Sequence, residues 1–294
     1  MKPQLIIQDF AGEHNKDLGK TGARLMRGGS WKKQRVIVVL PSADSIPAVV
    51  ALSHWNLIFP PNNGVLRILA QGMEVGDAYS SAIESVLAHP DLSEWEYLLT
   101  LEHDNCPPSD GVIRLIERLE CNSHLSAIGG LYFTKGEGGC AQIWGDPKDA
   151  PLNFRPQVPD PAGGLIECCG TGMGFTLFKL SMFKDQKLRR PWFKTLAGQG
   201  GVSTQDLYGW GDFRKHGYRP TIDIHNTVFG DMPVITLNFP NALYSLDVII
   251  TDVSTHIGYY SLGKMISQGD YDYNDPYFLR DVFSELDRII KECE

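Results

Sequence analysis

Three short apolar runs, separated by polar and amphipathic segments, are the strongest constraint that this 294-residue sequence places on its fold. They are residues 35–41 (RVIVVLP), 65–72 (VLRILAQG) and 97–101 (YLLTL). Continuous runs rich in Val, Ile and Leu are typical of strands that are buried on both faces of a parallel sheet. We therefore predict an α/β fold in which strands alternate with helices around an open, doubly wound sheet.

Two segments have the apolar spacing of helices that cover such a sheet. They are residues 78–90 (AYSSAIESVLAHP) and 111–120 (GVIRLIERLE). Asp77 is the predicted cap of the first helix, and either Ser109 or Asp110 is the predicted cap of the second. Ligands bind sheets of this kind outside the carboxyl ends of the strands, so we expect the functional residues there.

The second half of the chain changes character. Residues 146–164 are rich in proline and predict a surface loop. Residues 165–183 predict a strand, a glycine turn and a second strand that leads into a helix. Residues 200–224 predict a glycine-rich loop, a helix from about Asp206 and a final strand.

Composition and charge narrow the class of protein. Hydrophobic residues make up 43% and charged residues 21%, as in ordinary globular domains. The formal net charge of −8 argues against a protein that binds long nucleic acid through electrostatic attraction alone. No apolar run approaches the ~20 residues of a membrane span, and the N-terminus lacks the layout of a signal peptide. The six cysteines form no CxxC pair, which favours reduced thiols and a cytoplasmic protein.

The acidic pair Glu102 and Asp104, on either side of His103, directly follows the run at 97–101. Two carboxylates at alternate strand positions point the same way, and a bound cation relieves their repulsion. Hard divalent cations such as Mg²⁺ and Mn²⁺ prefer oxygen ligands and often take one or two carboxylates together with substrate phosphates. These residues are either a divalent-cation site at the sheet edge or a solvated strand end whose acids face water.

Other patterns also have two interpretations. The glycines at 170–174 (GTGMG) fail the dinucleotide fingerprint, because its third glycine would fall on Phe175, so they favour close backbone approach instead. Asp206 opens a helix, where an acid is favoured by the helix dipole without any further role. The histidines at 216, 225 and 256, taken singly, are typical of structural or solvated side chains.

Several segments occur in a fixed order: VIVVLPSAD from residue 36, EHD at 102, GGLYFTK from 129, IECCGTGMGFTLFKLSMF from 166, RPWFK from 190, TQDLYGWGDFRKHGYRPTID from 204 and THIG from 255. In this order they resemble the GT-A fold glycosyltransferases, particularly family-two-like enzymes and their relatives in phage and bacterial genomes. The resemblance covers roughly residues 35 to 260.

This resemblance implies a GT-A, Rossmann-like single domain with a mixed, mainly parallel central sheet flanked by helices. It implies an N-terminal extension at residues 1–34, a transferase domain at 35–265 and a C-terminal helical tail at 266–294. The implied donor is a UDP- or GDP-linked sugar, and the implied cofactor is Mn²⁺ or Mg²⁺. A phage-encoded relative would act in the host cytoplasm.

The resemblance also implies roles for individual residues. EHD is a variant of the DxD motif, in which Asp104 coordinates the metal on the donor diphosphate and Glu102 contacts the ribose or a metal-bound water. Asp206 occupies the position of the catalytic base in inverting relatives. A helix N-terminus favours the ionised form of an acid, so we expect no large pKa shift for Asp206. The remaining implied site residues are Pro41, Ser42, Asp77 and Gly172 for the nucleotide sugar, Trp192 and Phe193 for the acceptor, and His256 for the metal.

The sequence departs from the family pattern at three places. Gln205 stands where relatives carry a second acid before Asp206. Tyr79 and Ser80 stand where relatives often carry an Arg-Asn pair that contacts the pyrophosphate. The metal histidine has alternatives as well, because Asp231 or His225 can complete the site instead of His256.

The leading hypothesis is a metal-dependent glycosyltransferase whose acceptor is a hydroxyl on a glycan or on a hydroxymethylated base of phage DNA. The basic segments 27–33 (RGGSWKK) and 187–194 (KLRRPWFK) would suit phosphate contacts to DNA. A nucleotidyltransferase is an alternative, although the loop after the first strand lacks the usual glycines and basic residues. A degenerate transferase that binds a glycan without catalysis is the third hypothesis.

Overall fold

The computed structural model describes residues 33–42, 45–132, 141–149, 151, 153–159, 164–198 and 201–227, and the backbone of strands at 4–7, 234–238 and 245–250. The chain divides into two compact units, Lys20–Gly230 and a second unit made of Met1–Gly19 with Asp231–Glu294. In the second unit, β14 (Ser245–Ile250) pairs with β1 (Gln4–Ile7) in parallel and with β13 (Val234–Asn238) antiparallel. The domain limits implied at 34 and 265 stay predictions, and residues 265–294 lie outside the described residues.

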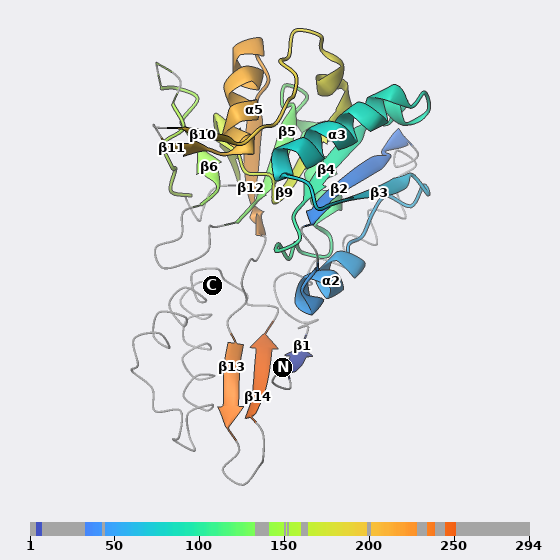
Figure 1. Cartoon of the computed structure of the whole chain (residues 1–294), viewed down its shortest axis with the longest axis vertical. Helices are drawn as coiled ribbons and strands as arrows, with labels where there is room; N and C mark the ends of the chain where they lie inside the picture. The colour runs from blue at the N-terminus through green and yellow to red at the C-terminus, as the bar shows by residue number, and fades with distance from the viewer. Residues whose placement is uncertain are drawn as a thin grey trace. The chain divides into compact units, whose positions relative to one another are not determined.

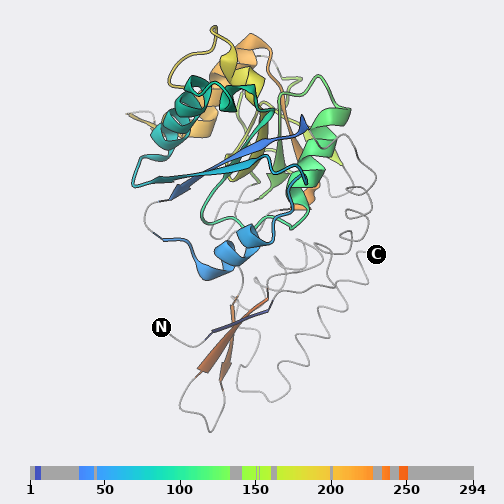
Figure 2. The same ribbon diagram turned by 90° about the vertical axis from the view of Figure 1, so that its right-hand side faces the viewer.

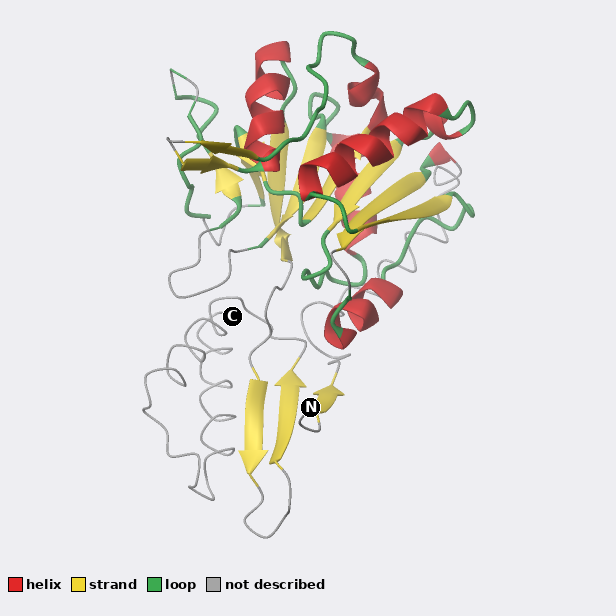
Figure 3. Cartoon of the chain, in the orientation of Figure 1, coloured by secondary structure: helices red, strands yellow, loops and turns green. Residues whose placement is uncertain are grey.

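The first unit is built on a seven-stranded sheet in the order β3-β2-β4-β9-β5-β12-β7 (Figures 1 and 3). Its strands are β2 (Val36–Ser42), β3 (Val65–Gln71), β4 (Tyr97–Leu101), β5 (Ala127–Leu131), β7 (Leu165–Glu167), β9 (Phe175–Lys179) and β12 (Pro220–Thr227). Strand β9 runs antiparallel to both of its neighbours, and β7 runs antiparallel to β12. The other strands are parallel, so the predicted mixed and mainly parallel α/β sheet is confirmed.

Helices and short hairpins complete this unit. The helices are α2 (Ala48–Trp55), α3 (Val75–Ala88), α4 (Gly111–Cys121) and α5 (Gln205–Phe213), with 3-10 turns η2 (Leu92–Glu94), η3 (Leu180–Lys184) and η4 (Arg214–His216). Two small antiparallel pairs join β6 (Ile143–Trp144) to β8 (Gly170–Thr171) and β10 (Leu196–Gly198) to β11 (Gly201–Ser203). No helix in the described part of the chain is long and apolar enough to cross a membrane.

The central strands β2, β4, β5 and β9 are buried on both faces, as predicted for residues 35–41 and 97–101. The edge strand β3 is partly exposed, which corrects the prediction for residues 65–72. Alternate residues of one strand point to opposite faces, so Val36 and Val38 join the core beneath α4, while Ile37 and Val39 join the core beneath α3 and α5. Figure 2 shows α4 on the opposite side of the sheet from α3. This layered arrangement leaves the carboxyl ends of the parallel strands as the place where polar residues can gather.

Helix starts differ from the sequence prediction in one case. Helix α3 begins at Val75, and its cap is Glu74, whose Oε2 accepts hydrogen bonds from the N–H groups of Gly76 (2.8 Å) and Asp77 (3.1 Å). The predicted cap Asp77 is therefore wrong, and this residue lies in the first turn. Asp110 does stand at the cap position of α4, but its Oδ2 accepts from Arg114 Nε at 2.7 Å and caps no backbone group.

Two other local predictions need correction. The first apolar run was placed at residues 35–41, yet β2 pairs with β3 beyond Pro41, as far as Ser42. Its pairing with β4 ends earlier, at Val39, before proline's missing N–H is reached. The short helix α2 was not predicted, since it has eight residues and no capping side chain.

Two glycines of α5 provide a test of how tightly this helix packs. A Cβ atom on Gly209 would lie 2.9 Å from two ring carbons of Phe193, whereas one on Gly211 would have its nearest neighbour, on Phe154, at 4.0 Å. We expect Gly211→Ala to stabilise the protein by about 0.5–1 kcal/mol through helix propensity. Gly209→Ala should destabilise it by about 1–3 kcal/mol because it overpacks the core. Denaturant unfolding of both variants measures the difference, and equal stabilities would contradict this packing.

Candidate active site

The acids Glu102 and Asp104 lie in a turn at the carboxyl end of β4, the third strand of the sheet. The strand ends at Leu101, so the two acids are not alternate strand residues as predicted. The turn is closed by the Asn105 N–H, which donates to the Glu102 carbonyl at 3.2 Å. The Glu102 N–H donates in turn to the Gly174 carbonyl at 3.0 Å, which ties the turn to the start of β9. The turn, rather than the strand pleat, brings the acids together.

Three carboxylates converge at this edge of the sheet. The pKa of Glu102 is raised from 4.5 to about 8, mainly by burial and in addition by the negative charges of Asp104 and Asp206. Asp206 comes from the first turn of α5, far along the chain, and is only 5% exposed. The structure thus brings together the candidate catalytic base and both acids of the EHD segment.

The pKa of Asp206 is shifted by its buried position in α5. Burial raises the pKa of its carboxyl, although hydrogen bonds from the Thr204 side chain and from the Leu207 N–H (2.9 Å to Oδ1) act in the opposite direction. Removal from water thus outweighs these local hydrogen bonds and sets the direction of the pKa shift, whereas the expectation that this shift is not large stays a prediction. A raised pKa makes Asp206 a stronger base once it is ionised.

Two buried tyrosines surround the Glu102 carboxyl. Tyr79 Oη on α3 lies 3.4 Å from Glu102 Oε1 and 3.4 Å from the Met173 carbonyl. Tyr132 Oη, just after β5, accepts a hydrogen bond of 2.8 Å from the Gly174 N–H. Burial and the nearby acids raise the pKa of both tyrosines well above the usual value, so both keep their protons. They supply neutral O–H groups to an acidic site.

Sequence reasoning missed this role for the tyrosines. Tyr79 was noted only as a departure from the Arg-Asn pair, and Tyr132 only as part of the segment GGLYFTK. Its position directly after an apolar strand, at the same edge as the acids, was the signal that could have identified it.

Gly172 and Gly174 are needed where Tyr132 approaches the backbone. A Cβ atom on Gly172 would lie 2.0 Å from Tyr132 Oη, and one on Gly174 would lie 2.7 Å from Tyr132 Cζ. These distances agree with the interpretation that the glycines allow close approach. A contact of Gly172 with a nucleotide sugar stays a prediction.

The other predicted nucleotide-sugar residues lie near the same edge of the sheet. Pro41 and Ser42 are buried at the carboxyl end of β2, next to β4 in the sheet order. Asp77 is exposed in the first turn of α3, two residues before Tyr79. These positions are consistent with their predicted role without testing it.

The predicted metal ligands are only partly within the described residues. Asp231 and His256 lie outside them, and of His225 only the backbone, in β12, is described. Within the described residues no group of three or more His, Cys, Asp or Glu side chains is placed to hold a metal ion. The oxygen donors of Glu102 and Asp104 nevertheless suit a hard divalent cation, which commonly takes one or two carboxylates and completes its shell with phosphates or water.

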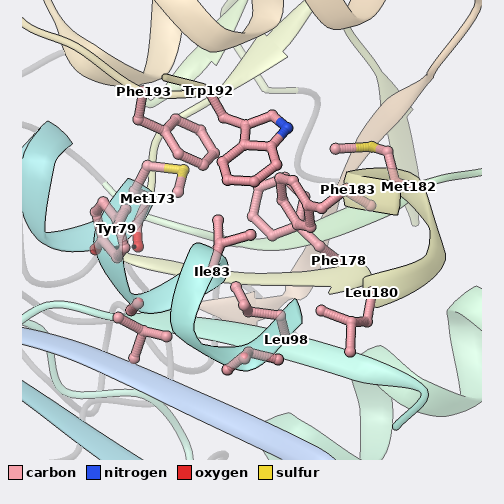
Figure 4. Close-up of a cluster of buried hydrophobic side chains, with 14 of the residues drawn as sticks. Tyr79, Ile83, Leu98, Met173, Phe178, Leu180, Met182, Phe183, Trp192 and Phe193 are labelled. Carbon is pink, nitrogen blue, oxygen red and sulfur yellow. Dashed lines mark hydrogen bonds between the residues drawn. The ribbon is translucent and has the colours of Figure 1, made fainter. Parts of the chain in front are cut away.

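Trp192 and Phe193 are core residues, which corrects their prediction as an acceptor surface. They are 1% and 0% exposed and pack in one aromatic cluster, drawn in Figure 4. The Phe193 ring contacts the Tyr79 ring edge-on at 5.8 Å between centroids, and the Ser80 hydroxyl holds the Phe193 backbone through two hydrogen bonds of 3.1 Å. Buried rings cannot stack on a sugar. They support the α3 segment that carries Tyr79.

Comparisons with known proteins concern the fold alone. No protein-family model and no curated protein sequence matches the chain. The chain is similar to the crystal structure of A197 from STIV, with 15% identity and a TM-score of 0.48, over 76% of this chain and 99% of that chain. It is also similar to GalNAc-T7 crystallised with UDP, GalNAc and Mn²⁺, with 10% identity and a TM-score of 0.46, over 87% of this chain and 55% of that chain. This chain therefore spans about half the length of the GalNAc-T7 chain, and neither likeness carries an argument about function.

Glu102 predicts a specific pH dependence of stability in the metal-free protein. Between pH 4.5 and about 8 its carboxyl is protonated in the folded state and ionised in the unfolded state, so the free energy of unfolding falls as the pH rises through this window. Glu102→Gln removes the titrating group. We expect the difference in the free energy of unfolding between this variant and the wild type to increase in favour of the variant, by up to about 1.4 kcal/mol for each pH unit across the window. Denaturant unfolding at several pH values measures the gap.

The matched control for this pH dependence is Glu84→Gln, which removes an exposed acid on the same helix as Tyr79. Its free energy of unfolding should stay close to that of the wild type, because the side chain is exposed. The burial of the Glu102 carboxyl would be contradicted if the difference in unfolding free energy between Glu102→Gln and the wild type did not grow with pH.

Proposed function

We propose that this protein is a metal-dependent glycosyltransferase that moves a sugar from a nucleotide sugar to an acceptor hydroxyl. The observation that carries the proposal is the convergence of Glu102, Asp104 and Asp206 at the carboxyl edge of the sheet. Three acids in one partly buried site are unfavourable unless protons or a cation offset their charge. The order of the segments that resemble GT-A glycosyltransferases supports the same conclusion.

Among the described residues, Asp104 is the proposed ligand of the cation, and Glu102 lies beside it. His256 is the proposed further ligand. Asp231 and His225 are the alternatives to His256. When bound, Mn²⁺ or Mg²⁺ would neutralise the charge that develops on the diphosphate leaving group. An imidazole ligand would favour Mn²⁺, because nitrogen ligands suit it better than Mg²⁺.

Asp206 is the proposed general base. It would accept the proton of the acceptor hydroxyl as that oxygen attacks the anomeric carbon, on the side opposite the diphosphate. Its burial next to Glu102 supports this role, because burial raises the pKa of the Asp206 carboxyl toward neutral pH. Tyr79, which keeps its proton, would hold Glu102 by a hydrogen bond while the acids change charge, and the neutral Tyr132 would lie nearby.

The donor and the acceptor follow from the resemblance and from surface charge. Pro41, Ser42, Asp77 and Gly172 are proposed to contact a UDP- or GDP-linked sugar. The proposed acceptor is a glycan or a hydroxymethylated base in DNA. Two exposed arginines support an acceptor that carries phosphate: Arg189, whose guanidinium lies 3.5 Å from the Tyr208 ring centroid, and Arg190, which lies 4.7 Å from that of Trp192.

Incubation with UDP- and GDP-linked sugars and Mn²⁺ tests the proposal. We expect slow release of nucleoside diphosphate, because transferases of this kind pass the sugar to water when no acceptor is present. Asp104→Asn should abolish both this release and metal-dependent nucleotide binding without changing the fold. Asp91→Asn, which alters an exposed acid before η2, is the matched control and should keep both.

Parallel incubations with a nucleoside triphosphate and a sugar phosphate, and with glycans, test the alternatives. Release of pyrophosphate from a nucleoside triphosphate and a sugar phosphate would identify a nucleotidyltransferase. Glycan binding without any release of nucleoside diphosphate would identify a degenerate transferase. Nucleotide binding by Asp104→Asn with unchanged Mn²⁺ dependence would show that the metal assignment is wrong.

For Asp206 we expect Asp206→Asn to lower turnover by about 10²–10⁴-fold, which is the usual contribution of a general base. Donor binding should barely change, because the carboxylate acts on the acceptor side. Steady-state kinetics and nucleotide titrations measure the two effects. NMR of the product must also show inversion at the anomeric carbon, and retention of configuration would refute the base assignment.

A further inference from the structure

The residue that follows the acids, Asn105, is buried although its side chain is polar. It is 4% exposed and lies in the loop between β4 and α4. Its Nδ2 donates a hydrogen bond of 2.9 Å to Asp104 Oδ1. The amide nitrogen must face Asp104, because an ionised carboxylate only accepts hydrogen bonds. A buried group thus restrains the rotation of the Asp104 carboxylate.

Gly174 provides the space that Asn105 occupies. A Cβ atom on Gly174 would lie 2.8 Å from Asn105 Nδ2 and 3.0 Å from Asn105 Cγ. The Gly174 carbonyl also accepts the Glu102 N–H. Asn105 is therefore wedged between the backbone at the start of β9 and the acid that it restrains.

Helix α2 holds the same loop from the other side. His54 Nε2 lies 3.0 Å from the Asn105 carbonyl and must donate to it, because a carbonyl oxygen only accepts. The Ser53 hydroxyl donates to the Pro107 carbonyl at 2.9 Å, and the Ile58 N–H donates to the Ser109 carbonyl at 2.8 Å. The loop that carries the acids is thus fixed at three carbonyls by one short segment of chain.

We propose that Asn105 is a positioning residue, which holds the Asp104 carboxylate in the orientation that binds a divalent cation, and that His54 of α2 holds Asn105 in its place. This inference rests on the proposed function and names the groups that make its cation site rigid. A ligand that is already oriented loses less conformational freedom when the cation binds. Partners that orient a metal ligand commonly contribute 10–100-fold to metal affinity.

Binding of Mn²⁺ followed by electron paramagnetic resonance tests this inference without any assay of turnover. Mn²⁺ is titrated into the full chain in the presence of UDP and, separately, GDP. Asn105→Leu keeps the shape of the side chain and removes its donor. We expect about 10–100-fold weaker Mn²⁺ binding and an altered spectrum of the bound ion, because the ligand geometry is no longer fixed. His54→Leu should weaken binding in the same direction by a smaller factor.

The matched control is Asn153→Leu. Asn153 Nδ2 donates to Asp149 Oδ2 at 2.8 Å, which is the same Asn–Asp hydrogen bond on a different loop. This variant should bind Mn²⁺ as the wild type does. If Asn105→Leu fails to fold, Asn105→Ser replaces it, because the serine hydroxyl is too short to reach Asp104. The expected loss of Mn²⁺ affinity is the same.

The outcomes separate the inference from the proposed function. Suppose that Asp104→Asn weakens Mn²⁺ binding but a folded Asn105 variant keeps the wild-type affinity and spectrum. That result would overturn the inference about Asn105 and leave the proposed function standing. A wild-type protein that binds no Mn²⁺ with either nucleotide would overturn the proposed function and the inference with it. The inference would also be overturned if Asn153→Leu weakened Mn²⁺ binding as much as Asn105→Leu does, because the effect would then not be specific to the contact with Asp104.

Discussion

The Glu102 carboxyl is held largely away from water, within reach of the negative charges of Asp104 and Asp206. Such an arrangement costs free energy in the unliganded protein, whether the carboxyl keeps a proton or the charges repel one another. The surrounding structure offsets part of this cost with the hydroxyl of Tyr79 and with the backbone hydrogen bond between the Glu102 N–H and Gly174. A site that carries such a cost is typical of function rather than of stability.

The core of the first unit makes this arrangement possible. Strands buried on both faces form a rigid base, and the turn after β4 is joined to β9 on one side and to α2 on the other. Glycines admit the groups that approach most closely, since a side chain at Gly172 or Gly174 would overlap Tyr132. The acids are therefore held by backbone hydrogen bonds, by the side-chain amide of Asn105 and by close packing.

The aromatic cluster has a related effect on α3 and α5. Phe193 lies between the Tyr79 and Phe213 rings, and Trp210 donates from Nε1 to the Thr171 carbonyl at 2.8 Å. These contacts join the helix that carries Tyr79 to the helix that carries Asp206. The positions of Asp206 and Tyr79 are consequently coupled through packed rings, and Phe193, which was expected at the surface, is one of these core residues.

The sequence by itself determined the strands, most of the helices and the placement of Glu102 and Asp104 at the carboxyl edge of the sheet. Apolar periodicity encodes these features, because each depends on residues close together in the chain. Only the tertiary structure decided that Asp206 lies near Glu102, that Tyr79 and Tyr132 keep their protons beside it, and that Trp192 and Phe193 are buried. The pKa of a carboxyl and the exposure of a ring depend on neighbours that come from distant parts of the chain, and local patterns carry no information about those neighbours.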